Sequence, residues 1–488
     1  MNMLINGEWV GIKERNKRDI INPADGSIID TVPQATEKDV LNAIEFAQLA
    51  KNKMAEMPAF RRAAILFECA DEMEKKKEQL ANLLARENGK PIRQTREEIA
   101  AAIRIFRGFA EESKRLFGKS MSLDMIPGME RHFAFTLRRP VGVVAAIVPF
   151  NYPVELYAHK VAAALAAGNA VIVKPPSDCP LTLLKVAEIL ENTGLPQGAH
   201  QMITGAGAVV GELLARSPGV NLISLTGSTN VGRRISLIAS ETLKRVHLEL
   251  GGNDATIICK DANIERAAEA VVLGRLARGN GQICCAVKRV FVEETICEEF
   301  LHMLVEKTKK LIVGDPLDEK TDVGPLITES AAISVEKSIN DAVEAGAEVC
   351  FGGKRSGAFI EPTILNNISF QSPIMEEEVF GPVAPVTSFK TLEEAVFYVN
   401  SSKYGLQSSV FTNNLETAMH MVYKLEAGGV IINWSSAVRV ENLPFGGIKL
   451  SGHGRESIPE TLMDMTDQKS VILYNALSVF NDKNGVQK

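Results

Sequence analysis

The chain has 488 residues, of which 45% are hydrophobic and 23% are charged, a composition typical of a globular protein that needs no disulfide or metal to hold its core. A formal net charge of −6 argues against a nucleic acid partner, because nucleic acid binding normally calls for a basic surface. Seven cysteines of which only two are adjacent, no signal-like N-terminus and no long uncharged apolar stretch predict a cytoplasmic protein without a membrane segment.

The elements predicted along the chain begin with helices. Between about 37 and 117, charged residues and alanine dominate and apolar residues recur at helical spacing. From residue 141, strands alternate with helices: strands are predicted near 141–148, 170–173, 201–204 and 222–225, and helices near 151–167, 181–192, 207–215 and from about 230. This alternation predicts βαβ units and a doubly wound parallel sheet over about 141–260.

A second α/β region is predicted from about 252 to 450, with strands near 288–293, 347–351 and 408–411. The tail after about 465 has the alternation of a strand, most clearly at 470–474. An isolated strand would expose an unpaired edge, so we expect the tail to pair with another subunit.

Two adjacent cysteines, Cys284 and Cys285, lie in a glycine-rich polar turn just before the predicted strand at 288–293. A structural cysteine normally lies inside an apolar element, whereas a reactive one lies in a polar setting. The turn therefore makes a nucleophilic role plausible, with an ordinary pair of loop cysteines as the alternative. No sequence motif for a metal site is present, so we predict no metal.

A second unusual residue is Glu249, a carboxylate between two leucines and directly before two glycines. Glutamate is seldom buried, and burial would raise its pKa into the range of a general base. An exposed glutamate at the end of a strand is the alternative.

Two further segments suggest ligand binding at strand ends. The segment 226–232 follows a strand and opens a helix, where backbone N–H groups can bind a phosphate, although it can equally be a simple tight connection. Lys174 ends another strand, where open α/β sheets bind ligands, although a surface lysine is the default.

Taken together, these segments resemble the aldehyde dehydrogenase superfamily over nearly the whole chain. The segments that match, in the order in which the family has them, are 149–153, 174–175, 226–228, 249–252, 281–284, 377–382 and 444–452. The resemblance implies an α/β fold with a Rossmann-type parallel-sheet cofactor domain (1–119 and 141–251) and a second α/β catalytic domain (252–450). It also implies a β-arm (120–140 and 465–488) that joins subunits into a homodimer or homotetramer.

The resemblance implies NAD(P)-dependent oxidation of an aldehyde to its carboxylic acid. Cys284 would attack the carbonyl carbon, and the Asn151 amide with the backbone N–H of Cys284 would form the oxyanion hole. Glu249 would activate the water that hydrolyses the resulting thioester. Two other possibilities are a CoA-acylating dehydrogenase, against which Glu249 argues, and a non-catalytic binding protein on the same fold.

The resemblance also implies which residues bind the coenzyme. Lys174 would bind the adenosine ribose, and Glu378 would bind the nicotinamide ribose beside Phe380. The residues implied along the pyrophosphate are Thr226, Gly227, Ser228 and Gly232. Ser177 stands where strict NAD users carry the glutamate that repels a 2′-phosphate, so both NAD and NADP stay open.

The expected substrate is a small anionic or hydroxylated aldehyde. His159, Arg439, Arg104 and Arg107 are predicted to face the substrate entrance, where guanidinium groups would bind an anion. The pattern is most similar to the lactaldehyde, phosphonoacetaldehyde and sulfolactaldehyde branch, with succinate semialdehyde and non-phosphorylating glyceraldehyde-3-phosphate dehydrogenases as alternatives. Glu441 departs from the aspartate usual in that branch. A structural ion pair at Arg439 and a buried, structural His159 are the competing interpretation.

Overall fold

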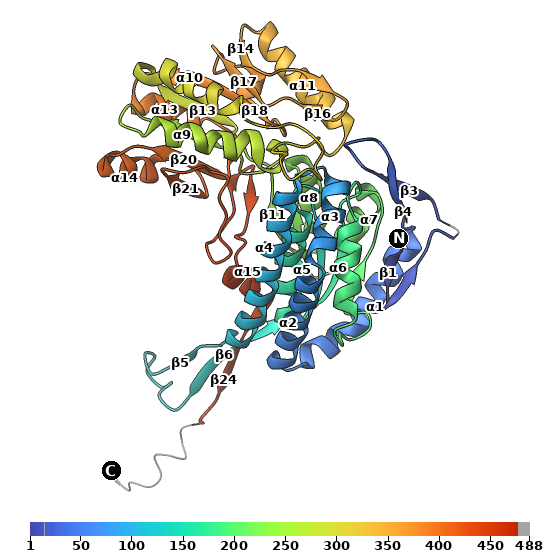
Figure 1. The fold of residues 1–488 in the computed structure, drawn as a ribbon. Coiled ribbons are helices and arrows are strands. Elements are labelled where there is room, and N and C mark those ends of the chain that lie inside the picture. Colours follow the sequence, from blue (N-terminus) through green and yellow to red (C-terminus); the bar gives the residue numbers. More distant parts are fainter. Residues whose placement is uncertain (14, 477–488) are drawn as a thin grey trace.

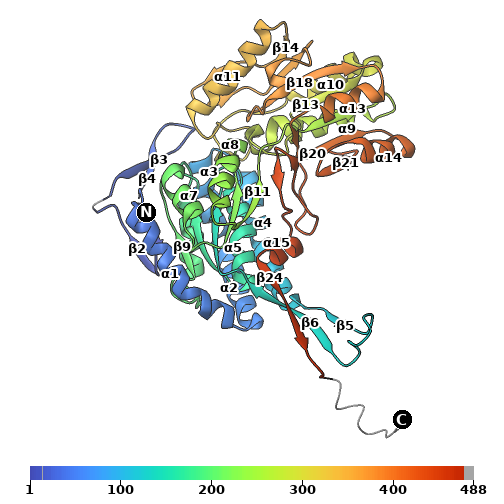
Figure 2. The same cartoon turned by 180° about the vertical axis from the view of Figure 1, so that it is seen from behind.

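The computed structural model describes residues 1–13 and 15–476, which form two α/β lobes and a projecting three-stranded arm (Figure 1). The first lobe contains the N-terminus, and the second contains the chain from about 255 to 432. The arm extends away from both lobes, as the view from behind also shows (Figure 2). No helix in the described ranges is both long and apolar enough to cross a membrane.

An eight-stranded sheet forms the centre of the first lobe. Its strands, in spatial order, are β2 (Glu8–Val10), β1 (Met3–Ile5), β9 (His200–Met202), β8 (Ala170–Lys174), β7 (Val143–Ile147), β10 (Leu222–Thr226), β11 (Arg245–Glu249) and β23 (Gly452–His453). The five strands from β9 to β11 run parallel, their neighbours β1 and β23 run antiparallel to them, and β2 at the edge pairs antiparallel with β1. This arrangement confirms the predicted α/β class with a parallel sheet.

Helices cover both faces of this sheet, which explains why its central strands are continuously apolar. Val144 and Ala146 of β7 face one core together with α2 (Ala59–Lys75), α4 (Ile92–Glu112), α5 (Pro153–Ala167) and α6 (Leu181–Glu191). Val143 and Ala145 face a second core with α1 (Glu37–Glu56), α7 (Gly207–Arg216) and α8 (Thr229–Ser240). Helix α3 (Lys77–Asn88) packs against α4 and α6.

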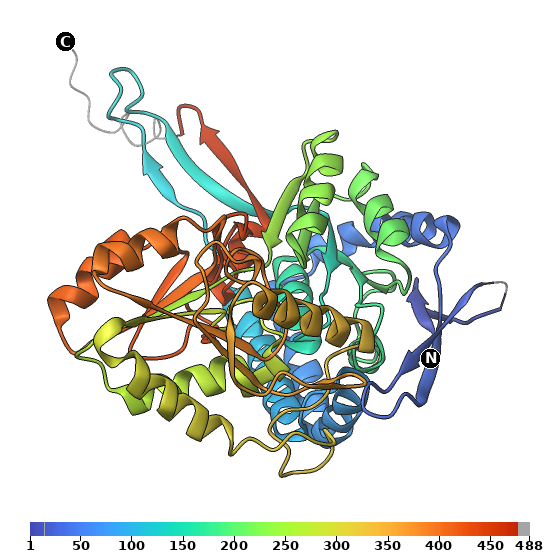
Figure 3. The same cartoon turned by 90° about the horizontal axis from the view of Figure 1, so that it is seen from above.

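The second lobe is built on a seven-stranded sheet. Its strands, in spatial order, are β14 (Glu348–Phe351), β17 (Thr363–Asn366), β18 (Val383–Phe389), β13 (Arg289–Glu293), β12 (Ala255–Ile258), β20 (Gln407–Phe411) and β21 (Gly429–Ile432). All pairs except β14 with β17 are parallel. The helices of this lobe are α9 (Ile264–Val271), α10 (Cys297–Thr308), α11 (Glu329–Glu344), α12 (Pro373–Glu376), α13 (Leu392–Asn400) and α14 (Leu415–Lys424). The view from above shows these helices beside the first lobe (Figure 3).

The predicted extension of the first sheet to about residue 260 is wrong. Strand β12 lies in the middle of the second sheet, between β13 and β20, so the first sheet's parallel strands end with β11. Apolar composition alone does not show which of two sheets a buried strand joins, because both environments require the same residues.

The arm consists of β5 (Ser120–Ser122), β6 (Phe133–Pro140) and β24 (Thr466–Leu473). The predicted tail strand exists, but it is not isolated, because β24 pairs along its whole length with β6 of the same chain. Only its second edge lacks a strand partner among the described residues. Residues 477–488 of the predicted arm lie outside the described residues.

Small elements complete the chain. They are β3 (Lys17–Ile21) with β4 (Ile28–Pro33), β15 (Arg355–Ser356) with β16 (Phe359–Ile360), β19 (Tyr404–Gly405) with β22 (Ile448–Lys449), and helix α15 (Ile458–Asp464).

Candidate active site

A cavity of about 1060 Å³, here called the sheet-end cavity, lies at the carboxyl ends of the parallel strands of the first sheet. Its lining residues are Val148, Pro149, Phe150, Asn151, Lys174, Pro176, Ser177, Asp178, Thr226, Gly227, Ser228, Leu250, Gly251, Cys284, Glu378 and Phe380. Parallel strands end at the same edge of a sheet, so segments distant in sequence meet here. Five of the predicted coenzyme residues from the first lobe line this cavity: Lys174, Ser177, Thr226, Gly227 and Ser228.

The floor of the sheet-end cavity includes the start of helix α8. Ser228 is the N-cap of this helix, and its side chain accepts a hydrogen bond from the backbone N–H of Val231 at 3.4 Å. Gly232 does not line the cavity, but it packs so closely on Leu250 that a Cβ would lie 2.5 Å from a leucine methyl carbon. The helix start and the unpartnered, buried Thr226 hydroxyl fit a phosphate group.

Lys174 and Ser177 form one end of the cavity. Lys174 Nζ donates to Ser177 Oγ at 3.2 Å, and the Ser177 hydroxyl donates to the Gly205 carbonyl at 3.4 Å. Burial lowers the pKa of Lys174 to about 8. The neighbouring Asp178 also lines the cavity, but it forms an ion pair with Arg18, a pair that sequence reasoning missed.

The second lobe supplies the opposite wall. Glu378 accepts a hydrogen bond from the Gly252 N–H at 3.3 Å, and its carboxylate lies 3.0 Å from the ammonium group of the buried Lys288. Phe380 packs edge-to-face against Phe150, with ring centres 5.8 Å apart. Lys288 was not predicted; its position four residues after Cys284 was the available signal.

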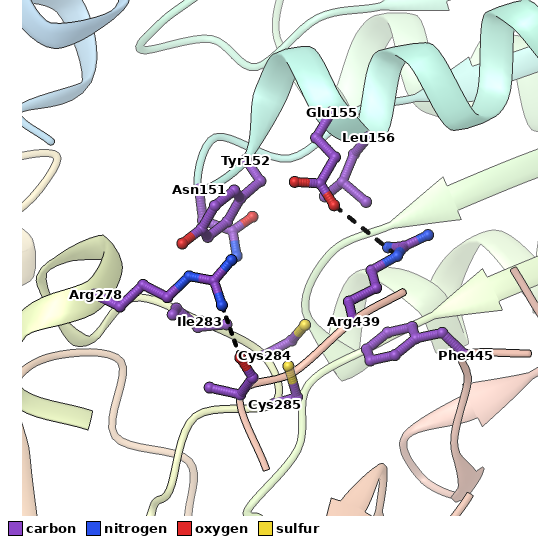
Figure 4. A pocket seen from close by; sticks show the side chains of 11 residues that line it. Asn151, Tyr152, Glu155, Leu156, Arg278, Ile283, Cys284, Cys285, Arg439 and Phe445 are labelled. Atoms are coloured by element: carbon purple, nitrogen blue, oxygen red, sulfur yellow. Dashed lines mark hydrogen bonds and ion pairs between the residues drawn. The ribbon is translucent and has the colours of Figure 1, made fainter. Parts of the chain in front are cut away.

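A smaller cavity of about 440 Å³, here called the loop cavity, adjoins the sheet-end cavity at Asn151 and Cys284 (Figure 4). Its lining residues are Asn151, Tyr152, Glu155, Leu156, Arg278, Ile283, Cys284, Cys285, Ala437, Arg439 and Phe445. Asn151 and Cys284 line both cavities. A ligand in either cavity can therefore reach these two side chains.

Backbone geometry places Cys284 at this shared wall. The preceding turn has positive φ angles at Gly279 and Gly281, and a Cβ at Gly281 would lie 2.4 Å from the carbonyl carbon of Gly381. Only glycine fits such a close approach. The hydrogen bond with Cys285 and burial raise the pKa of the Cys284 thiol, while the nearby Lys288 lowers it. Lys288 is therefore the nearby cation that favours the thiolate form of Cys284, the form that acts as a nucleophile.

Glu249 ends strand β11 and is 4% exposed. Within the described residues neither of its carboxylate oxygens has a hydrogen-bond partner, and His247 Nε2 is 3.9 Å from Oε1. Burial and the charge of Glu456 raise its pKa well above the usual value. An unpartnered buried carboxyl is costly, and such groups concentrate at functional sites.

Arg439 lines the loop cavity but is held by carboxylates. One of its terminal nitrogens donates to the buried Glu456 at 2.8 Å, and its Nε lies 4.0 Å from Glu155. Glu456 also pairs with the buried Lys160 at 2.9 Å. Sequence reasoning missed Glu155, Glu456 and Lys160, because ion pairs between distant segments leave no local pattern.

Arg278 is the other arginine of the loop cavity, and it was missed. Its guanidinium donates to the Ala437 carbonyl at 2.9 Å, and it forms no ion pair within the described part of the chain. It lies opposite Arg439 across the two cysteines in Figure 4. Its place six residues before Cys284, beside the glycine-rich turn, was the available signal.

Three predicted substrate residues do not line the loop cavity. His159 is fully buried and packs edge-to-face against Phe109, with ring centres 6.2 Å apart. Arg104 and Arg107 are exposed residues on α4 and pair with Glu441 and Asp71. Of the four predicted substrate residues, only Arg439 lines the loop cavity.

Comparisons with known proteins agree with this geometry. Residues 9–471 match the aldehyde dehydrogenase family. The chain is 41% identical over 472 residues to 3-sulfolactaldehyde dehydrogenase of Priestia aryabhattai, covering 96% of this chain and 97% of that protein. It is 40% identical over 477 residues to lactaldehyde dehydrogenase of Methanococcus vannielii, covering 97% of this chain and all of that protein. A crystal structure of glyceraldehyde-3-phosphate dehydrogenase from Methanocaldococcus jannaschii with NADP superposes with a TM-score of 0.90 at 39% identity, covering 94% and 99% of the two chains.

Proposed function

Because the chain belongs to the aldehyde dehydrogenase family and is an NAD(P)-dependent oxidoreductase, we propose that it oxidises a small aldehyde bearing an anionic group. The observation that carries this proposal is Arg278, a guanidinium group at the loop cavity without a carboxylate partner in the described residues. The 3-sulfolactaldehyde and glyceraldehyde-3-phosphate dehydrogenase relatives are both named for anionic aldehydes.

Cys284 is the proposed nucleophile. The thiol loses its proton to water, the thiolate sulfur bonds to the aldehyde carbon, and the carbonyl oxygen takes the negative charge. The Asn151 amide and the backbone N–H of Cys284 would stabilise this oxygen, where one such donor is typically worth about 100–1000-fold in rate. Asn151 and Cys284 line both cavities, so the adduct would form where the loop cavity meets the sheet-end cavity.

When bound, NAD or NADP would supply the hydride acceptor for the adduct, and a thioester would remain on Cys284. Lys174, Ser177, Thr226, Gly227, Ser228, Gly232, Glu378 and Phe380 are the residues proposed to hold the coenzyme. Glu378 is already bound by Lys288 and the Gly252 N–H, so its carboxylate is fixed in direction before a ribose binds.

Glu249 is the proposed base for thioester hydrolysis. Burial raises its pKa, which makes its carboxylate a stronger base toward water, and neither of its oxygens has a hydrogen-bond partner among the described residues. A Cβ at residue 446 would lie 2.7 Å from Glu249 Oε1, so Gly446 leaves space for this carboxyl. Water then attacks the thioester carbon, the acid leaves, and the Cys284 thiol is restored.

Arg278, rather than Arg439, is proposed to bind the substrate anion. Glu456 already forms an ion pair with Arg439, whereas Arg278 donates to the Ala437 carbonyl, lies beside the Tyr152 hydroxyl and has no ion-pair partner among the described residues. A guanidinium group offers several donors in a fixed fork that matches sulfonate, phosphonate, phosphate and carboxylate groups. His159, Arg104 and Arg107 have no part in this proposal.

The test is a panel of short aldehydes assayed with both coenzymes, with anionic members matched to neutral members of similar size. We expect kcat/KM to favour the anionic members. Arg278→Met should lower that value by about 10-fold or more for anionic aldehydes, in line with a lost hydrogen bond to a charged group. Neutral members such as lactaldehyde should change by less than about 3-fold. Arg104→Met, which removes an exposed guanidinium outside the cavity, is the matched control.

A preference for neutral aliphatic aldehydes, unaffected by Arg278→Met, would end the anionic-substrate proposal. In that case, the hydroxylated but neutral lactaldehyde class, for which the Methanococcus vannielii relative is named, takes its place.

Assembly and location are also proposals. The open edge of β24 and the exposed Ile472, Leu473 and Tyr474 support an arm that joins subunits into a dimer or tetramer. Seven free cysteines support a reducing cytoplasmic setting.

A further inference from the structure

Two buried ionic side chains lie directly behind the turn that carries Asn151. Lys90 lies between α3 and α4 and is 1% exposed, and Glu98 lies on α4 and is 2% exposed. They form an ion pair with each other. Neither side chain lines the sheet-end cavity or the loop cavity, so neither can touch a bound ligand there.

Lys90 holds Asn151 itself. Its ammonium group donates to the Asn151 backbone carbonyl at 2.7 Å and lies 4.0 Å from the centre of the Tyr152 ring. Fixing the carbonyl of a residue limits the directions in which its side chain can point. Asn151 and Tyr152 both line the loop cavity, so this one ammonium group contacts two parts of the cavity wall.

Glu98 holds the residues that follow. Its carboxylate accepts hydrogen bonds from the Val154 N–H at 2.9 Å and the Glu155 N–H at 3.4 Å, at the first turn of α5. On the preceding side, the Asn88 amide donates to the Phe150 carbonyl at 2.6 Å. The backbone of 150–155 is thus bound at both ends and in the middle by side chains from 88–98.

We propose that Lys90 and Glu98 form a positioning pair that aims the Asn151 amide at the oxygen of the adduct on Cys284. This inference rests on the proposed function. A buried ion pair adds little net stability compared with apolar residues of the same size, so stability alone gives no reason for one here. The position of the Asn151 amide has a larger effect on the reaction rate, because a donor displaced by about 1 Å can cost about 100-fold in rate.

The chain contains a matched control for a purely structural role. Glu87 is fully buried and accepts hydrogen bonds from the Leu181 and Thr182 N–H groups, both at 2.7 Å, at the start of α6. It therefore caps a helix as Glu98 does. Among the described residues Glu87 makes no hydrogen bond to the 150–155 turn.

The experiment compares the double variant Lys90→Met/Glu98→Gln with Glu87→Gln, each with and without Asn151→Ala. The double variant leaves no unpaired buried charge and keeps an oxygen at residue 98 to cap α5. Two rates are measured: the burst of reduced coenzyme with an aldehyde, and p-nitrophenolate release from p-nitrophenyl acetate, which acylates a thiol without coenzyme.

We expect the double variant to lose about 10- to 100-fold in both rates when Asn151 is present, and no more than about 3-fold further when Asn151 is already alanine. Coenzyme Kd should not change, and Glu87→Gln should leave both rates within about 3-fold. If the aldehyde panel is inactive but the ester rate shows this dependence on Asn151, the proposed function fails and the positioning pair stands.

Three outcomes would overturn the positioning pair. The double variant could lose equally with and without Asn151, its rates could be unchanged, or Glu87→Gln could lose as much as the double variant. If the double variant does not fold, Lys90→Arg replaces it, because arginine keeps the buried charge but moves the donors. If Lys90→Arg lowers the two rates only when Asn151 is present, the result supports the proposal. If the Lys90→Arg rates equal those of the parent protein, the proposal is overturned.

Discussion

The two cavities that meet at Cys284 are built in different ways. The sheet-end cavity is shaped largely by backbone, with strand ends, the start of α8 and closely packed glycines. The loop cavity is shaped by charged side chains from distant segments, with Arg278 and Arg439 on opposite sides and Glu456 holding the second. A cavity made of backbone is specified by short local motifs, whereas one made of ion pairs is specified only by the finished fold.

This difference matches the chemistry on each side. NAD and NADP share the same dinucleotide framework, so one arrangement of backbone donors can bind either coenzyme. An aldehyde substrate differs among relatives, and side chains on loops can change without disturbing the sheets. Four predictions test this division, from the largest expected effect to the smallest.

The largest effect is expected at the wall that both cavities share. Cys284→Ala should lower turnover by more than about 10⁴-fold, because the acylated atom is gone. Coenzyme binding, measured by fluorescence titration, should persist, because the sheet-end cavity remains. Cys285→Ala is the control and should keep most activity. Turnover by the Cys284→Ala protein would refute the nucleophile assignment.

Glu249→Gln should slow thioester hydrolysis by about 100- to 10,000-fold while leaving the burst of reduced coenzyme intact. Because the pKa of Glu249 is raised, its base form grows as the pH rises through that pKa. Wild-type hydrolysis should therefore speed up as the pH rises above the usual range of a glutamate, and the variant should lose this dependence. Stopped-flow absorbance separates the two steps, and an unchanged steady state would contradict the role.

Ser177→Glu should raise the KM for NADP by about 10- to 100-fold, because a carboxylate there would repel the 2′-phosphate. The KM for NAD should change little, and the ranking of aldehydes should not change at all. Ser177→Gln, of equal size but neutral, is the control. A change in the ranking of aldehydes would contradict the claim that the two cavities bind coenzyme and substrate independently.

The smallest effect is expected at Arg104. Its pair with Glu441 is exposed, and such pairs contribute about 0–1 kcal/mol. Arg104→Ala should change kcat/KM by less than about 2-fold for every aldehyde. A selective loss for anionic aldehydes would show that the predicted entrance cluster on α4 does bind substrate after all.

Much of the first sheet could be predicted from sequence, because strands buried on both faces are continuously apolar and end at glycine, proline or lysine signals. The strands β7, β8 and β10 lie within a residue or two of their predictions. The strands β1, β2 and β23, each two or three residues long, were not predicted, and neither was the five-residue β11. The sheet membership of β12 required knowing the tertiary arrangement.

The site divides in the same way. Cys284 and Glu249 stand out locally, as a thiol in a polar turn and a carboxylate among leucines. Arg278, Glu155 and Glu456 do not, because a charged residue has no sequence signal for the distant partner that neutralises it or leaves it free. The predicted role of His159 depended on its spacing from Asn151, and its complete burial could not be inferred from that spacing.

The segment from 433 to 451 leaves the second sheet at β21 and joins the first at β23. This segment connects the two lobes, and it carries Arg439 and Phe445, which line the loop cavity. A displacement of one lobe relative to the other would therefore also displace Arg439 and Phe445, and with them the wall of the loop cavity.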